Sequence, residues 1–168
     1  MSDRQRMDRL EEEYLRNAGA AIRFAYLLTG DREMAQDLAQ EAFVRVASRL
    51  RHVRAMDQLD AYLRSTIVNL FRSSLRRGRL ERAFLERERA TGAITAIHRD
   101  SPAERDDVWR AMRRLPHRQR AAVVLRHYED LSERDAAQIL GCSVRALNSL
   151  IVRAMTTLRA ELERGETP

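Results

Sequence analysis

The amino-acid sequence predicts an all-α protein. Apolar residues recur at helical spacing along almost the whole chain, and no stretch shows the alternation of apolar and polar residues that marks a strand. Only six glycines and three prolines occur in 168 residues, so long uninterrupted helices are expected. Hydrophobic residues make up 44% and charged residues 33%, which is typical of a folded protein and argues against disorder.

Three helices are predicted in the N-terminal half, followed by a linker. The helices are expected at Met7–Leu28, Arg32–Leu50 and Gln58–Arg77. A Thr-Gly-Asp turn would end the first helix and Gly78 the third, because glycine favours the left-handed conformation at a helix C-terminus. The segment Leu80–Arg89 is compatible with one more short helix, and residues 81–100 as a whole are interpreted as a linker.

The C-terminal half begins with a strong helix-start signal. Ser101-Pro102-Ala103-Glu104 combines a capping box with proline at the first helical position. The sequence therefore predicts two small helical domains, one over residues 7–80 and one over residues 101–164. Because a linker joins them, we expect the two domains to move relative to each other.

Four helices are predicted in the C-terminal domain, and the last two form a helix-turn-helix candidate. The four are expected at Pro102–Arg114, Pro116–Tyr128, Ser132–Leu140 and Ser143–Glu163. Between the last two, Gly141 supplies a left-handed turn, Ala137 a small residue and Leu147 an apolar plug. Many structural helix hairpins share this pattern, so DNA binding and simple packing both remain open.

The last predicted helix has an apolar stripe and a mixed outer face. At about 100° per residue, the expected core stripe is Val144, Leu147, Ile151, Ala154, Met155, Leu158 and Leu162. The opposite face carries Arg145, Ser149, Val152, Arg153 and Thr156. Asn148 and Leu150 lie on the two flanks, so an apolar Val152 interrupts a face that would otherwise suit DNA.

Positive charge is concentrated in the third helix. The net charge is +6. The segment from Arg64 to Arg82 contains six arginines and only one acidic residue, Glu81. Such a stripe indicates a polyanion partner, although a solvated helix face is the simpler alternative. The outer face carries Ser65, Asn69, Arg72 and Arg76, flanked by Arg64, Arg77 and Arg79. Tyr62 and Phe71 either stack on an unpaired base or, as is more common, belong to the core.

The second helix carries a patch that suits a protein partner. Its apolar stripe runs from Ala35 to Leu50, and the far side presents Asp37, Gln40, Glu41 and Val44. An apolar spot with a polar rim is typical of a protein contact. A solvated face with one stray valine explains the same pattern, because single exposed apolar residues are common.

No enzyme or metal chemistry is indicated by the remaining residues. The four histidines are scattered, with no Cys or His at metal-ligand spacing, so neither a metal nor a cofactor is expected. Cys142 is interpreted as a small packing residue. No run of 18 apolar residues and no signal peptide is visible, so we expect no membrane span and a cytoplasmic location.

Taken in order, these segments resemble the extracytoplasmic-function (ECF) sigma factors of bacterial RNA polymerase. The resemblance covers about Tyr14 to Leu162. It rests on the segments "LLTGDREMAQDLAQEAFVRV", "AYLRSTIVNLFRSSLRR" and "LPHRQRAAVVLRHYEDLSERDAAQILGCSVRALNSLIVRAMTTLRAEL". In the family these segments bind the clamp helices of the largest polymerase subunit, melt and recognise the −10 promoter element, and recognise the −35 element.

The resemblance implies roles for individual residues. Core-polymerase binding would fall to Asp37, Gln40, Glu41 and Val44. Binding of the −10 element, with capture of an extruded base, would fall to Arg64, Asn69, Arg72, Arg76 and Arg77. Recognition of the −35 element would fall to Arg145, Asn148, Ser149 and Arg153, with Arg118 and Arg120 as weaker candidates for phosphate contacts.

Further partners are also implied by the resemblance. The flap region of the polymerase and an anti-sigma factor are expected to bind the protein. The linker is expected to pass through the polymerase cleft.

The last helix departs from the family pattern. Many members have Thr-Val-Lys-Ser-Arg where this chain has Ala146-Leu147-Asn148-Ser149-Leu150, so two cations are missing. Asparagine pairs bidentately with adenine, so Asn148 either changes the sequence that is recognised or accompanies a loss of recognition. Two alternatives to a sigma factor follow: a stand-alone helix-turn-helix regulator, and a sigma-like protein that binds partners with altered −35 recognition.

Overall fold

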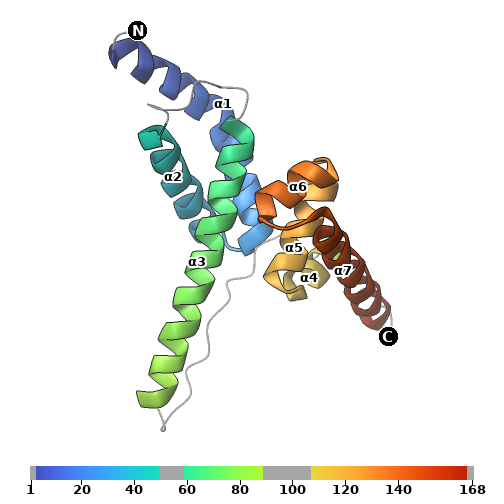
Figure 1. The fold of residues 1–168 in the computed structure, drawn as a ribbon. Helices are drawn as coiled ribbons and strands as arrows, with labels where there is room; N and C mark the ends of the chain where they lie inside the picture. The colour runs from blue at the N-terminus through green and yellow to red at the C-terminus, as the bar shows by residue number, and fades with distance from the viewer. Residues whose placement is uncertain (1–2, 50–58, 89–106, 166–168) are drawn as a thin grey trace.

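The computed structural model describes residues 3–49, 59–88 and 107–165, and these residues form helices joined by short turns, as the sequence predicts. No strand occurs within the described ranges. In chain order the elements are α1 (Asp3–Thr29), α2 (Arg32–Arg49), α3 (Leu59–Glu88), α4 (Asp107–Arg114), α5 (His117–Val123), the π-helical turn η3 (Val124–Tyr128), α6 (Glu133–Leu140) and α7 (Val144–Gly165). Figure 1 labels the seven α-helices within these described ranges.

A tight turn sets α2 beside α1. Gly30 adopts the left-handed conformation with φ of 71°, which a side chain would strain. Asp31 then caps α2, because its Oδ1 accepts a hydrogen bond of 2.9 Å from the backbone N–H of Met34. The predicted end of the first helix and start of the second are therefore confirmed.

The third helix is longer than the sequence predicts. Gly78 lies inside α3 and does not end it, since the helix continues to Glu88. A single glycine costs about 1 kcal/mol in a helix, which the neighbouring turns readily tolerate. Figure 1 shows the C-terminal part of α3 extending well beyond the rest of the molecule. The first eight residues of the predicted linker, 81–88, are thus helical, and residues 89–100 lie outside the described residues.

The helix predicted over Pro116–Tyr128 forms, but its last turn is wider than an α-helix. The backbone N–H of Glu129 donates to the carbonyl of Val124, five residues back, at 3.0 Å. Residues Val124–Tyr128 therefore form a π-helical turn between α5 and α6. The predicted capping box at residues 101–104 lies outside the described residues.

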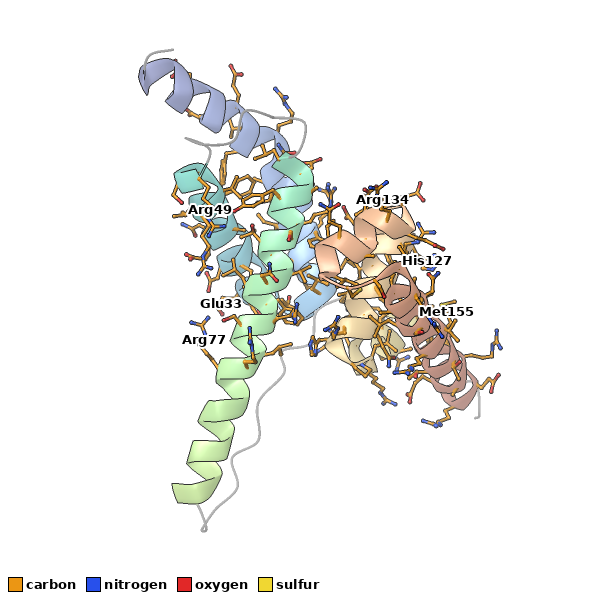
Figure 2. The ribbon with its side chains drawn as sticks, in the orientation of Figure 1. Glu33, Arg49, Arg77, His127, Arg134 and Met155 are labelled. Atoms are coloured by element: carbon orange, nitrogen blue, oxygen red, sulfur yellow. The ribbon has the colours of Figure 1, made fainter. Side chains whose placement is uncertain are left out.

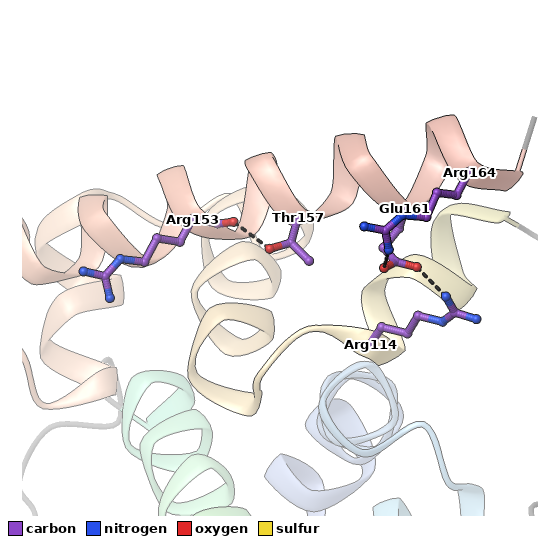
Figure 3. Close-up of polar contacts among 5 residues, drawn as sticks. All are labelled: Arg114, Arg153, Thr157, Glu161 and Arg164. Atoms are coloured by element: carbon purple, nitrogen blue, oxygen red, sulfur yellow. Dashed lines mark hydrogen bonds and ion pairs between the residues drawn. The ribbon is translucent and has the colours of Figure 1, made fainter.

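Glu161 joins α4 to α7. Its carboxylate accepts hydrogen bonds from Arg114 on α4 and, at 2.8 Å, from Arg164 on α7 itself (Figure 3). The Glu161 side chain is only 14% exposed, so these charge-assisted bonds are partly shielded from water. The same view shows the Thr157 hydroxyl donating to the Arg153 carbonyl at 3.1 Å.

One hydrophobic core runs through both halves of the molecule. Buried residues of α1, α2 and α3 and buried residues of α4 to α7 form a single connected cluster. Its most deeply buried large side chains are Phe24, Leu28, Ile67, Val68, Met112, Val124, Leu125, Leu140 and Leu147. Helical periodicity predicts a core stripe of Leu59, Leu63, Ile67, Leu70 and Ser74 on the third helix. The four apolar residues are buried, whereas Ser74 is half-buried.

Aromatic contacts link the two halves directly. Tyr26 of α1 stacks on Trp109 of α4, with ring centroids 5.5 Å apart, and Phe71 of α3 meets His117 of α5 edge-on at 6.5 Å. The two halves, which the linker predicts to be mobile, are packed against each other in this structure through these aromatic pairs and the shared core.

Among the described helices, none by itself is long and apolar enough to cross a membrane. The bent pair α6 and α7, which meet at 93°, satisfies the length and composition criteria only when the two helices are taken together.

Candidate functional site

The outer face of α2 presents the predicted docking patch, defined as Asp37, Gln40, Glu41 and Val44. All four side chains are exposed, and Val44 is 60% exposed. The opposite face packs into the core through Ala35, Leu38, Ala39, Ala42 and Val46. Glu41 forms an ion pair of 2.7 Å with Arg45 one turn later, and both remain in solvent. The patch is therefore an apolar spot with a polar rim, open to a partner.

The outer face of α3 presents an amide among cations. Asn69, Arg76 and Arg77 are exposed, and Arg72 is half-buried. At about 100° per residue Asn69, Arg72 and Arg76 lie within about 60° of one another, and Arg77 flanks them. Figure 2 shows Arg77 extending from α3 into solvent. This arrangement places three guanidinium groups on the C-terminal side of one amide, where they can bind a nucleic-acid backbone.

Arg64 lies apart from the other four. Its Nε donates to Oε2 of Glu129, just after η3, at 2.7 Å, and its Nη1 lies 3.7 Å from Asp60. The Arg64 and Glu129 side chains are only 21% and 17% exposed. In this arrangement the Arg64 guanidinium joins α3 to the C-terminal half, a contact that no local sequence signal indicates.

The two aromatic candidates of α3 do not serve as open stacking surfaces. Phe71 is only 5% exposed and belongs to the core. Tyr62 is half-buried, and its hydroxyl accepts a hydrogen bond of 2.6 Å from Arg49 of α2. The core interpretation is therefore correct for Phe71, and Tyr62 helps to pack α3 against α2.

The turn between α6 and α7 has the geometry predicted for a helix-turn-helix. Ser132 caps α6 by accepting from the Asp135 backbone N–H at 3.1 Å, and Ser143 caps α7 by accepting from Ala146 at 3.1 Å. Gly141 is left-handed with φ of 62°. Leu147 is fully buried between the helices. These features fix the angle at which α7 leaves the turn.

The outer face of α7 forms a shallow groove. We call it the recognition face, and its lining residues are Val144, Arg145, Asn148, Ser149, Val152 and Arg153. Val152 is 66% exposed in the middle of it. The predicted stripe is only partly correct, because Leu147, Ala154 and Leu158 are buried while Val144 and Met155 are exposed. The recognition face thus combines two arginines with two valines, Val144 and Val152, whereas contacts to phosphates alone would favour cations.

Asn148 is held from the neighbouring helix. Its Nδ2 lies 3.4 Å from Oε2 of Glu133 at the start of α6. Sequence reasoning missed Glu133, because the two residues are 15 positions apart and only the turn brings them together. Leu150, on the other flank of α7, packs against the core.

Arg120 is not placed to contact phosphates. It is half-buried, its Nη2 reaches the Leu115 carbonyl at 3.5 Å, and its buried Nε has no hydrogen-bond partner. Burial, and to a lesser extent the nearby charge of Arg113, lowers the pKa of the Arg120 guanidinium from its usual value. Among the described residues, no group of three or more His, Cys, Asp or Glu side chains could hold a metal ion.

Two family models match the chain. The model for sigma-70 region 2 matches residues 14–81, which include α2 and most of α3. The model for sigma-70 region 4 matches residues 105–158, which include the helix-turn-helix.

Curated relatives match most of the chain. The RNA polymerase sigma-E factor of Streptomyces avermitilis is 35% identical over 153 residues, covering 90% of this chain and 84% of the relative. The ECF RNA polymerase sigma factor EcfG of Rhodopseudomonas palustris is 31% identical over 160 residues, covering 92% and 86%.

Solved structures share the fold. The sigma factor RpoE in complex with the anti-sigma factor NepR, from Bartonella quintana, superposes with a TM-score of 0.70 and 26% identity, covering 91% of this chain and 96% of the other. The structure of CnrH in complex with the cytosolic domain of CnrY has the same fold, with a TM-score of 0.62 at 22% identity. Because both sigma-70 regions match in this order and these relatives align over most of the chain, the chain belongs to the ECF family of RNA polymerase sigma factors.

Proposed function

We propose that this sigma factor directs RNA polymerase to promoters through three separate faces on α2, α3 and α7. The observation that carries the proposal is that each face is exposed while the opposite side of its helix contributes to the core. The protein acts as a specificity subunit and has no catalytic activity of its own.

The docking patch on α2 binds core polymerase through the clamp helices of the largest subunit. Val44 supplies an apolar centre, and the carboxylates of Asp37 and Glu41 together with Gln40 supply a polar rim. A partner that covers Val44 gains from burying it, and the surrounding charges restrict the orientation. A second contact with the flap region is made by the C-terminal half.

The outer face of α3 binds the −10 element. Asn69 contacts a base extruded from the non-template strand, and Arg72, Arg76 and Arg77 bind the flanking phosphates. Capture of an unpaired base favours the melted state, because a paired base cannot enter the same contact. Arg64 can bind a phosphate only after its ion pair with Glu129 has broken.

The recognition face on α7 binds the −35 element in the major groove. Arg145 and Arg153 provide cations near its two ends, and Asn148 and Ser149 provide hydrogen-bonding groups. Two cations fewer than in many relatives would lower the slope of affinity against salt by about 0.9 for each lost phosphate contact.

An anti-sigma factor and a cytoplasmic location complete the proposal. The anti-sigma partner is supported by the similarity to RpoE, whose solved structure contains NepR. The location follows from the function, because promoter recognition requires access to polymerase and the chromosome. Residues 7–80 and 101–164 are the proposed domains, joined by the linker that passes through the polymerase cleft.

Transcript-start mapping tests the function. The full chain is added to bacterial core polymerase and a genomic DNA library, and new 5′ ends are sequenced. Starts that share both upstream elements are the expected result. Failure to bind core polymerase would contradict the proposal and favour a stand-alone helix-turn-helix regulator. Binding to polymerase with only a −10 motif would favour a sigma-like regulator with altered −35 recognition.

A further inference from the structure

The recognition face contains few groups that can distinguish bases. The Ser149 hydroxyl donates to the Arg145 carbonyl at 3.0 Å. Just beyond the recognition face, the Thr156 hydroxyl donates to the Val152 carbonyl at 3.0 Å. Both hydroxyl protons are therefore used within the helix. The Ser149 oxygen can still accept a hydrogen bond but has no proton left to donate. Apart from the two arginines, the donor and apolar groups that remain on this face are the amide of Asn148 and the side chain of Val152.

The contact with Glu133 fixes the orientation of the Asn148 amide. An ionised carboxylate only accepts hydrogen bonds, so the NH₂ end of the amide faces Glu133 Oε2, at 3.4 Å. One N–H of Asn148 and its Oδ1 remain available to a ligand. An N–H donor beside a carbonyl acceptor matches N7 and N6–H₂ of adenine in the major groove.

Val152 lies one helical turn after Asn148 on the same face. Four residues at about 1.5 Å each separate them by about 6 Å along the axis, which is less than two base-pair steps of about 3.4 Å. At 66% exposure Val152 has most of its surface in water. In the major groove, the apolar group that such a side chain can cover is the C5-methyl of thymine.

We propose that α7 recognises a pair of nearby A·T base pairs in the −35 element, with Asn148 contacting adenine and Val152 packing on a thymine methyl. Glu133 is a positioning residue in this scheme and holds the Asn148 amide from α6. The inference rests on the proposed function and specifies what the −35 element must contain.

The first experiment removes one methyl group at a time from the DNA. The holoenzyme, assembled from full chain and core polymerase, selects sequences from a promoter library randomised in the −35 region. In the selected promoter each thymine is then replaced by deoxyuridine, which lacks only the methyl group. One position should lose about 4-fold in open-complex formation, the effect of one buried methyl group. Replacing the contacted adenine by another base should cost roughly 5- to 150-fold.

Variants assign each effect to a residue. Val152→Ala should abolish the difference between thymine and deoxyuridine, while Val108→Ala, which shortens an exposed valine on α4, should retain it. Asn148→Ala should abolish the preference for adenine at its position. If Val152→Ala still distinguishes thymine from deoxyuridine, or Asn148→Ala still prefers adenine, the assignment of that residue is wrong.

Two substitutions of Glu133 separate positioning from folding. Glu133→Gln removes the negative charge near DNA but keeps an acceptor, so affinity should rise and the adenine preference should remain. Glu133→Ala removes both, so affinity should rise while the adenine preference falls at least 3-fold. If the two variants show the same adenine preference, Glu133 does not position Asn148.

The results separate this inference from the proposed function. If no polymerase-dependent transcript forms at any promoter, both fail. If transcripts form at a common −10 element but the selected −35 sequences lack adenine and thymine, or no thymine responds to deoxyuridine, the inference alone is overturned.

Discussion

The outer faces of α3 and α7 differ in how they can bind nucleic acid. The α3 face carries Arg72, Arg76 and Arg77 within about two helical turns after Asn69. The α7 face separates Arg145 and Arg153 by about two turns, with Asn148 and Val152 between them. Closely spaced guanidinium groups bind any polyanion strongly, and an amide beside an apolar side chain discriminates between bases. We infer that α3 contributes mainly affinity and melting, and α7 mainly selectivity.

The largest expected effect comes from removing charge on α3. The double substitution Arg72→Ala and Arg76→Ala should lower open-complex formation roughly 100-fold, because two charge-assisted contacts of about 1.5 kcal/mol each are lost. The slope of log affinity against log salt should decrease by about 1.4, as expected for two contacts to a single strand. The control substitutions Arg23→Ala and Arg32→Ala, at exposed positions of α1 and α2, should leave that slope unchanged. An unchanged slope in the α3 variant would contradict its role in affinity.

Substitution of Val44 tests the docking patch on α2, which should contribute to polymerase binding and not to DNA binding. Val44→Arg places a long charged side chain at the apolar centre of the docking patch and should weaken binding to core polymerase about 30-fold, equivalent to roughly 2 kcal/mol of desolvation. Fluorescence anisotropy of labelled protein measures this affinity. Val108→Arg, at an exposed site on α4, is the matched control. Equal losses in both variants would mean that Val44 has no special role.

Asn69 should affect melting without affecting polymerase binding. Asn69→Ala should reduce open-complex formation about 10-fold, because a hydrogen-bonded contact to the extruded base is removed while the arginines remain. Permanganate reactivity of unpaired thymines measures melting, and anisotropy measures polymerase binding. Equal decreases in both would show that the role given to Asn69 is wrong.

The smallest effect concerns the ion pair between the halves. Glu129→Gln removes the charge that holds Arg64 and should raise the affinity of the free protein for single-stranded −10 DNA about 3-fold, with an increased radius of gyration in small-angle scattering. Asp130→Asn removes an equal charge at the next position, which is exposed, and should change neither quantity as much. Equal responses from both variants would mean that the contact does not restrain Arg64.

Local features of the fold could be predicted from the sequence because their causes are local. The caps at Ser132 and Ser143 and the left-handed Gly141 involve residues within a few positions of each other. The core side of α3 follows from its helical period. These features suffice to predict an all-α chain with a helix-turn-helix.

Other features depend on contacts between distant segments. The helix α3 continues through Gly78 because its other residues stabilise the helix by more than the ~1 kcal/mol that one glycine costs. Arg64 and Glu129 are 65 positions apart, so no spacing pattern marks their pairing. Asn148 meets Glu133 only across the turn. The sequence therefore predicted which faces are exposed better than it predicted what restrains the side chains on them.

Directed DNA cleavage tests whether α3 lies at the −10 element and α7 at the −35 element. Cys142→Ser removes the single cysteine, and Ser73→Cys on α3 or Thr156→Cys on α7 then carries an iron chelate that cuts nearby DNA in the open complex. We expect cuts at the −10 element from residue 73 and, separately, at the −35 element from residue 156. Cuts at the same promoter position from both sites would contradict this arrangement.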